Sequence, residues 1–392
     1  MTIRLLLNGT AIPIDEAVFT TLFDNSVAAT YAGYAKALES KSIKFADLVD
    51  LSRKGDIPYS LFFAPLSLVE TQVATKTKKL LAGVSKDSFS IGSREKVELR
   101  DVELIIKDLI RKQELLKKHD RSLERNKVVG MLHKPGTSAE SDATRLMAGL
   151  GLSHEAMREC RKMEDALDLL IERLEANQVL VSRSVQHYMP QRLTHVQFSG
   201  ITIRDNKVPF IFLAGGDHGD YQEPVGRTIF TLTLMAVLVA RRIFAPVTWD
   251  GQSAGIGAGR EYDIVGAMLM PATRLREIGP TSLSEMKALA AEFKVTASAV
   301  TVRAMRLGII NGETATSHLD ELRIEFGRRP QIQGMNPIKP ENAVRKYSGR
   351  ELSSRMLRVL DAGQISQGDF CRVICLNKLK PAQIMNLREA LG

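Results

Sequence analysis

The longest apolar segment of the chain spans residues 227–244. Within it, residues 229–240 carry no charge, and only Thr231 and Thr233 bring hydroxyl groups into the run. A membrane crossing needs roughly 20 apolar residues, so the segment predicts a helix buried in a protein core. Arg241 and Arg242 follow the run, where the negative end of a helix dipole favours cations.

Helical periodicity also marks the segments that precede this one. Residues 101–126 place apolar side chains largely at helical spacings with charges on the other face, which predicts a long amphipathic helix. Residues 144–152 and 160–178 predict two further helices, and Ser138 or Ser141 is the candidate N-cap at their start.

Strand periodicity appears in two places. Residues 3–7 form an apolar, strand-like run ahead of a helical stretch, and three more strands are predicted just before the apolar segment. Residues 205–207 are predicted to form a hairpin turn between the last two of them. The three predicted strands are residues 179–185, 194–205 and 208–214. Strands beside one buried helix predict an α+β, mostly helical fold with a small sheet.

The chain beyond the apolar segment is again helical. Residues 261–271 predict one helix, and residues 282–310 have the form of a helix-turn-helix. A loop rich in Arg, Gln and Pro begins after residue 322 and leads to two or three short helices. The candidate N-caps of the helix-turn-helix are Ser282 or Ser284 for its first helix and Thr296 or Ser298 for its second.

These patterns divide the chain into five regions. The expected regions are an N-terminal helical unit (residues 1–65) with a degenerate form of a repressor-like helix-turn-helix, an amphipathic connecting region (66–135), a core (136–275), a helix-turn-helix-like unit (276–321) and a C-terminal helical extension (322–392). A chain of 392 residues exceeds one ordinary core, so more than one compact unit is expected.

Composition adds limits on location and partners. The chain is 44% hydrophobic and 25% charged, as in soluble globular proteins, and its beginning lacks an export signal. We therefore expect a cytoplasmic protein. Three cysteines, Cys160, Cys371 and Cys375, are too few for a disulfide framework and are interpreted as buried thiols. The net charge of +9 favours a polyanionic partner, although the excess is spread along the chain.

Several of these segments, in this order, resemble the ImmA/IrrE family of zinc-peptidase-like proteins. The matching pieces are KFADLVDLSRKGDIPYSLFF, IIKDLIRKQELL, MEDALDLLIERLEANQVLV, FSGITIRDNKVPFIFL, the MLMP at residues 268–271 and the helix-turn-helix after it. Members of this family are associated with XRE-type repressors, and they partner with or cleave phage-repressor-like transcription factors. The resemblance implies a zincin-like small sheet with helices.

The resemblance breaks at the metal-binding helix. Family members carry two histidines four residues apart, with a glutamate beside the first that activates water. Leu234 and Leu238 stand at the histidine positions of this chain, and Met235 replaces the glutamate. Leucine has no donor atom and a thioether is a poor zinc ligand. The resemblance therefore implies a pseudo-metallopeptidase without a cofactor, in which these three side chains pack where a metal would sit.

Zinc would require ligands that have moved elsewhere. The candidates are Asp217, His218 and Asp220 in one glycine-rich stretch, together with Glu261, which lies near the position of a family carboxylate ligand. Arg260 aligns with that position more closely. The competing interpretation of residues 217–220 is a solvated turn.

Contact with DNA is the remaining alternative. The second helix of the predicted helix-turn-helix offers Arg303 and Arg306 to phosphates. Packing within the scaffold is the competing role of this helix pair.

The function expected from these features is non-catalytic. We expect a regulatory or toxin-type protein of a prophage, defence or toxin–antitoxin system that binds a repressor-like or antitoxin protein. The alternatives are a divergent zinc metallopeptidase that cleaves a repressor and a DNA-binding transcription regulator. No membrane contact is expected, and the sequence leaves the oligomeric state open.

Overall fold

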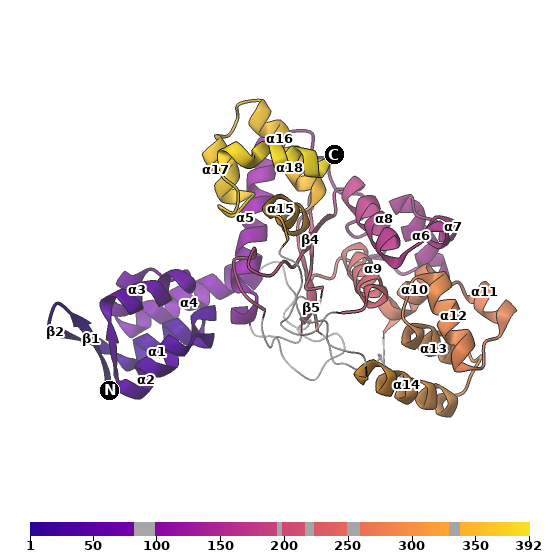
Figure 1. Ribbon diagram of the computed structural model, residues 1–392, viewed down its shortest axis with the longest axis horizontal. Helices are drawn as coiled ribbons and strands as arrows, with labels where there is room; N and C mark the ends of the chain where they lie inside the picture. Colours follow the sequence, from indigo (N-terminus) through magenta and orange to yellow (C-terminus); the bar gives the residue numbers. More distant parts are fainter. Residues whose placement is uncertain (82–98, 194–197, 216–222, 249–258, 329–337) are drawn as a thin grey trace. The chain divides into compact units, whose positions relative to one another are not determined.

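The chain divides into two compact units in the computed structural model (Figure 1). The described residues are 1–81, 99–193, 198–215, 223–248, 259–328 and 338–392. Of these, the first unit holds residues 1–81, 99–110 and 190–193, and the second unit holds the remainder. The described residues contain eighteen α-helices and two small mixed sheets, so the predicted α+β, mostly helical class is confirmed.

The first unit contains a three-stranded sheet in the order β2-β1-β3. Strand β1 (Thr2–Leu7) pairs antiparallel with β2 (Thr10–Asp15) and parallel with β3 (Ser42–Lys44). Ile3 and Leu5 of β1 point into the core with the period of two that a half-buried strand requires. The strand predicted at residues 3–7 is confirmed as part of β1, while β2 and β3 are strands that the sequence pattern did not predict.

Helices cover this sheet around an aromatic core. Helices α1 (Glu16–Asp24), α2 (Ala32–Ser40), α3 (Phe45–Lys54) and α4 (Leu66–Leu81) form in chain order. The rings of Phe19, Phe23, Tyr34 and Phe62 lie with centroids 4.8–5.9 Å apart. The unit extends past the predicted boundary at residue 65 because α4 packs on α1.

The predicted amphipathic helix is confirmed as α5 (Glu103–His119). Its residues up to Ile110 belong to the first unit and those from Arg111 onward to the second. Within the second unit, the Gln113 side chain donates a hydrogen bond of 2.9 Å to the backbone oxygen of Val208. This buried bond ties the second half of α5 to the start of a strand.

The second unit is built on a four-stranded sheet in the order β4-β6-β5-β7. Strand β4 (Leu180–Arg183) runs parallel to β6 (Phe210–Leu213), while β5 (Phe198–Ile203) is antiparallel to β6 and to β7 (Pro246–Thr248). Asp205 accepts hydrogen bonds from the backbone N–H groups of Lys207 and Val208, so the predicted hairpin turn is confirmed. The short strand β7 is not predicted by the sequence pattern.

Nine helices lie between residues 139 and 327 in the described part of the chain, and two of them, at residues 163–176 and 225–241, pack on this sheet. The nine helices are α6 (Ala139–Leu150), α7 (His154–Glu159), α8 (Met163–Ala176), α9 (Val225–Arg241), α10 (Arg260–Leu269), α11 (Ala272–Ile278), α12 (Leu283–Phe293), α13 (Ala297–Arg306) and α14 (Gly312–Gly327). The N-caps predicted at Ser138, Ser282 and Thr296 form, each accepting a backbone N–H within the first turn.

Four helices close the chain. They are α15 (Pro340–Ser348), α16 (Arg350–Asp361), α17 (Gln367–Val373) and α18 (Ile384–Leu391). They join the sheet at β4, where the Ser182 hydroxyl donates to the backbone oxygen of Tyr347. Gly349, the N-cap of α16, has φ +85°, and a Cβ there would lie 2.7 Å from both Glu175 Oε1 and the Val181 oxygen. Only glycine satisfies both conditions.

No helix among the described residues has the length and apolar character needed to pass through a bilayer.

Candidate functional site

Helix α9 is apolar on every side, and the surrounding elements bury it. Its residues from Thr231 to Ala240 are all buried, and α8, α10, β5 and β6 pack against it (Figure 1). The Thr233 hydroxyl is satisfied within the helix by donating to the Ile229 oxygen at 2.8 Å. A helix that is hydrophobic all round belongs in a core, and α9 occupies the centre of the largest core cluster described.

The three positions singled out by the family resemblance lie inside this core. Leu234 is 2% exposed, and Met235 and Leu238 are fully buried. Met235 packs against β5: a Cβ placed on Gly200 would be 2.2 Å from the Met235 methyl carbon. The same Cβ would also be 2.2 Å from the Phe212 oxygen. The thioether therefore fills the space between α9 and the sheet at this point.

Charged side chains near the end of α9 and the start of α10 form ion pairs with each other or with α6. Glu261 lies 3.4 Å from Arg241, measured between Oε1 and Nη2. Arg260 contacts Asp142 Oδ2 through Nη2 at 2.7 Å and Nε at 3.1 Å. Its Nη2 also donates to the backbone oxygens of Gly136 and Ser138. Both residues near the expected ligand position thus connect parts of the scaffold.

The remaining ligand candidates fall outside the described residues. Asp217, His218 and Asp220 belong to that part of the chain. Among the residues that the structure does describe, no three His, Cys, Asp or Glu side chains form a group that could hold a metal ion.

Three arginine–carboxylate pairs join α6, α10 and α13, and we call this set the arginine seam. It comprises Arg260 with Asp142, Arg303 with Glu140, and Arg306 with Asp263. The Arg303 Nη2 to Glu140 Oε1 distance is 3.3 Å, and Arg306 Nε lies 2.9 Å from Asp263 Oδ1. Burial lowers the pKa of Arg303, and Glu140 opposes that shift. An arginine nevertheless stays charged in proteins.

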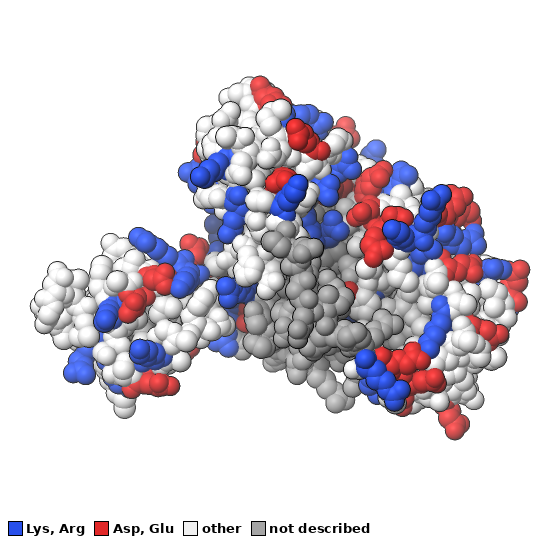
Figure 2. Space-filling model, in the orientation of Figure 1, with Lys and Arg blue, Asp and Glu red and all other residues white. Residues whose placement is uncertain are grey.

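Close packing fixes Arg303 in the seam. Its side chain is 5% exposed, and a Cβ on Gly266 of α10 would lie 2.9 Å from its Cδ. The Arg306 side chain is 20% exposed. Acidic and basic side chains are interspersed over the neighbouring surface of α11–α14 (Figure 2). For both predicted DNA-contacting arginines, this placement favours packing within the scaffold over contact with phosphates.

The α12–α13 turn is also engaged by α9. A Cβ on Gly226, in the first turn of α9, would lie 2.7 Å from the backbone carbon of Val295. The two backbones therefore meet without a side chain between them. Helix α13 is held from two sides, by this contact and by the arginine seam, so its position depends on α9.

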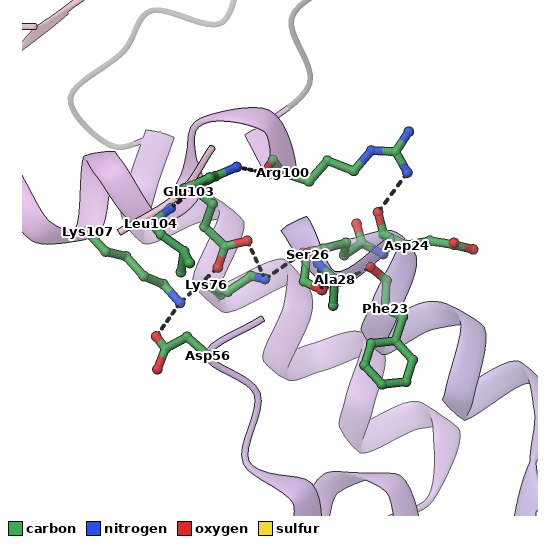
Figure 3. A network of polar contacts seen from close by, with 12 residues as sticks. Phe23, Asp24, Ser26, Ala28, Asp56, Lys76, Arg100, Glu103, Leu104 and Lys107 are labelled. Carbon is green, nitrogen blue, oxygen red and sulfur yellow. Dashed lines mark hydrogen bonds and ion pairs between the residues drawn. The ribbon is translucent and has the colours of Figure 1, made fainter. Parts of the chain in front are cut away.

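The first unit contains a polar network that the sequence did not predict (Figure 3). Glu103 is 1% exposed and forms ion pairs with Lys76 at 3.0 Å and with Lys107 at 2.8 Å. Lys107 also binds Asp56 at 2.8 Å, and Lys76 donates to the Asn25 oxygen. Burial opposes the charge of Lys107, but the two carboxylates raise its pKa. The network ties the start of α5 to the helices of this unit.

The same network extends along residues 99–104 through backbone groups. Arg100 donates from Nη1 to the Asp24 oxygen at 3.2 Å. Gln191 accepts from the Leu104 N–H at 2.9 Å and donates to the Arg100 oxygen at 2.6 Å. The residues of this network come from segments far apart in the chain. Only the pair of Glu103 and Lys107, four residues apart on one helix, could have been predicted from local sequence. The network is structural, because each charge already has a partner.

A second buried carboxylate, Glu175, lacks such pairing. It lies at the end of α8 and is 5% exposed. Its Oε2 accepts the Glu351 N–H at 3.1 Å, and it makes no ion pair within the described residues. Burial raises the pKa of Glu175 to about 7. It forms the junction between α8 and the first turn of α16.

The cysteines have little nucleophilic character. All three are free, and Cys371 and Cys375 are buried as predicted, whereas Cys160 is half-buried. Burial raises the pKa of Cys375 to about 12 and raises that of Cys160. The thiolate is the reactive form, so neither position is suited to catalysis.

Comparison with known proteins adds no relative. No family model matches the chain, and none of the curated proteins or solved structures matches it either.

Proposed function

We propose that this chain is a non-catalytic regulatory protein that binds a repressor-like or antitoxin protein, in a prophage, defence or toxin–antitoxin setting. The observation that carries the proposal is the packing of Leu234, Met235 and Leu238 inside the core around α9. The kind of partner is inferred from the ImmA/IrrE resemblance. The non-catalytic role is inferred from these three side chains, which pack in the core and carry none of the family's catalytic groups.

The chemistry of these side chains supports a binding role. Zinc-dependent peptide hydrolysis needs nitrogen or oxygen donors around the metal and a base that takes a proton from water. Met235 instead places a thioether against Gly200, and the leucines contribute only hydrocarbon. The alternative of a peptidase with displaced ligands rests on Asp217, His218, Asp220 and Glu261, of which Glu261 is paired with Arg241.

The burial of α9 also affects where a partner would bind. An apolar groove open to a peptide would leave leucine surface exposed, which is unfavourable in water. Since α9 is covered by its own chain, the partner is expected on an outer surface of the protein. Helix α9 then serves as the scaffold that positions that surface.

The test is reconstitution with the repressor-like product of the neighbouring gene. The two purified proteins are mixed with and without a chelator, then separated by size-exclusion chromatography and weighed by intact mass spectrometry. We expect a stable complex, an uncleaved partner and no effect of the chelator. A partner cleaved only without chelator would establish the peptidase instead, and no complex would reject the proposed binding.

Two variants separate binding from hydrolysis. Glu261→Gln and His218→Ala each remove a displaced-ligand candidate, and we expect both to leave the complex and the bound metal content unchanged. Met235→Leu keeps an apolar side chain of similar volume and serves as the matched core control. Stoichiometric zinc that disappears with His218→Ala would contradict a non-catalytic role.

A further inference from the structure

A group of exposed basic residues lies beside the turn between β5 and β6. We call it the basic surface and define it as Arg121, Arg125 and Lys127, which follow α5, with Arg204 and Lys207 at the turn. All five are exposed. The two segments are joined by their backbones, because the Asn126 N–H donates to the Asn206 oxygen at 2.9 Å. Residues next to these two asparagines therefore share one surface.

Side-chain amides hold this surface in one conformation. Asn126 donates from Nδ2 to the backbone oxygens of Asn177 and Lys207, at 2.9 and 3.3 Å. Gln178, just after α8, donates from Nε2 to the oxygens of Glu124 and Lys207, at 3.0 and 3.1 Å. The backbone that carries the basic residues is thus fixed before any partner binds, which lowers the entropy cost of binding.

The carboxylates around the basic surface are largely neutralised by other cations. Asp205 lies 2.8 Å from the Lys117 ammonium, and Asp120 lies 2.7 Å from Arg355. In the described part of the chain, none of the five basic side chains forms an ion pair with a carboxylate, and Glu124 is the remaining exposed acid between residues 120 and 127. This differs from the arginine seam, where each arginine is paired.

The local sequence has the same imbalance. Residues 111–135 contain eight Lys or Arg and three Asp or Glu, a net excess of five within a chain whose total excess is nine. Part of the chain's positive excess is therefore local to this segment, and the hairpin turn adds Arg204 and Lys207 to it.

We propose that the basic surface binds the phosphate backbone of duplex nucleic acid. Unpaired, exposed Arg and Lys side chains on a fixed backbone attract phosphates and release their counterions. Residues 120–127 and 204–207 contain no aromatic side chain, and binding of single strands relies on aromatic stacking. The surface is formed by a loop and a turn, so it contacts the backbone without reading bases. This inference is independent of the proposed protein partner.

Fluorescence anisotropy with a labelled duplex of about 24 base pairs tests the proposal, over roughly 50 to 200 mM salt. The variant is Arg125→Gln/Lys127→Gln/Lys207→Gln in the full-length chain. We expect it to weaken duplex binding by about tenfold or more and to reduce the slope of log K against log salt by about 3. Wild-type protein that does not bind duplex at the lowest salt would overturn the proposal.

The matched control removes the same charge elsewhere. Lys36→Gln/Lys78→Gln/Lys79→Gln changes three exposed lysines of the first unit, and we expect its affinity to stay within about twofold of wild type. Equal losses in both variants would show that net charge alone matters and would overturn the proposal. So would tighter binding to a single strand of the same length. Vesicles containing phosphatidylglycerol provide the last arm: binding to them, without duplex binding, would overturn it in favour of a membrane surface.

Discussion

Helix α9 and the arginine seam are both buried parts of the second unit, yet they are held by different forces. Around α9 the contacts are apolar, and Leu234, Met235 and Leu238 contribute only packing. In the seam, Asp142 is fully buried and depends on the charge of Arg260, with Arg145 3.3 Å away on the same helix. Apolar contacts degrade gradually as volume is lost, whereas an ion pair leaves a buried charge once one partner is removed.

The difference also separates two uses of charge in this protein. The arginines that the sequence offers to DNA, Arg303 and Arg306, are used to hold α6, α10 and α13 together. Helix α9, by contrast, contributes no charge to the core between Thr231 and Ala240. Charge that remains available for a partner must therefore be sought outside the seam, as on the basic surface.

The largest effect is expected from Arg260→Ala in the seam. The change leaves the fully buried Asp142 carboxylate without its closest cation. We expect unfolding free energy to fall by about 3–5 kcal/mol, measured by urea denaturation. Arg276→Ala removes an exposed arginine of α11 and is the control, with an expected change within about 0.5 kcal/mol. A loss no larger than that of the control would mean that the seam does not stabilise the unit.

Truncation of a side chain in the α9 core is expected to lower the unfolding free energy slightly less than Arg260→Ala does. Leu238→Ala removes a fully buried side chain and should lower the unfolding free energy by about 3 kcal/mol through lost burial and a cavity. Leu238→Met conserves volume and should cost under about 1.5 kcal/mol. If the two variants were equally stable, the position would not be close-packed.

Glu175 sharpens the comparison, because it is a buried carboxylate without a paired cation. Its pKa is about 7 in the folded protein and 4.5 in the unfolded reference, so between these values the folded state holds a proton that the unfolded state has lost. Stability therefore falls as pH rises from about 4.5 to 7 and stays lower above 7. Glu175→Gln can still accept the Glu351 N–H and should be more stable at pH 8 by up to about 3 kcal/mol.

The advantage of Glu175→Gln should disappear near pH 4.5, which thermal denaturation at the two pH values measures. Glu164→Gln, an exposed position at the other end of α8, is the control and should show no such pH-dependent gain. An advantage that does not depend on pH would exclude titration of Glu175 as its cause.

The contact between α9 and the α12–α13 turn should respond to a single methyl group. Gly226→Ala places a Cβ 2.7 Å from the Val295 backbone carbon, so one backbone must move. We expect a loss of about 2 kcal/mol, measured by chemical denaturation. Gly312→Ala, where no atom lies within 4 Å of the added Cβ, should be neutral or stabilising. Equal effects at the two positions would refute close backbone packing.

The smallest effect is expected at the partly exposed end of the seam. Arg306 pairs with Asp263 where the two side chains are 20% and 35% exposed. We expect Arg306→Gln to cost under about 1 kcal/mol, because water and salt screen such a pair. A loss as large as that of Arg260→Ala would mean that the three pairs act as one network, which a double-mutant cycle would measure.

Local rules predicted much of the second unit. The uncharged run became α9, Ser138, Ser282 and Thr296 became N-caps, and the turn at residues 205–207 joined two antiparallel strands. In each case the determining signal lies within a few residues of the element. The N-terminal hairpin carried a local signal as well, since Asn8 and Gly9 both have positive φ, as such a turn requires.

The contacts between distant segments could not be predicted in this way. Arg303 seemed suited to phosphate contact because the sequence does not place Glu140 beside it, 163 residues earlier. The Glu103 network likewise depends on Lys76 and Asp56, which approach only in the folded unit. Ion pairs of this kind carry no periodicity, so their partners emerge only from tertiary structure. The family resemblance remains a prediction, because it rests on an ordered series of weak sequence matches.

The burial of α9 from Thr231 to Ala240 has a consequence for how the chain is made. During synthesis α9 emerges before α10, α12 and α13, which later pack against it or its first turn. A ribosome that has reached residue 260 thus presents a long apolar helix with part of its partner surface still missing. Such intermediates are prone to aggregate and to engage chaperones. Truncated chains that end before residue 306 are expected to be insoluble, while the N-terminal unit has its own aromatic core by residue 81.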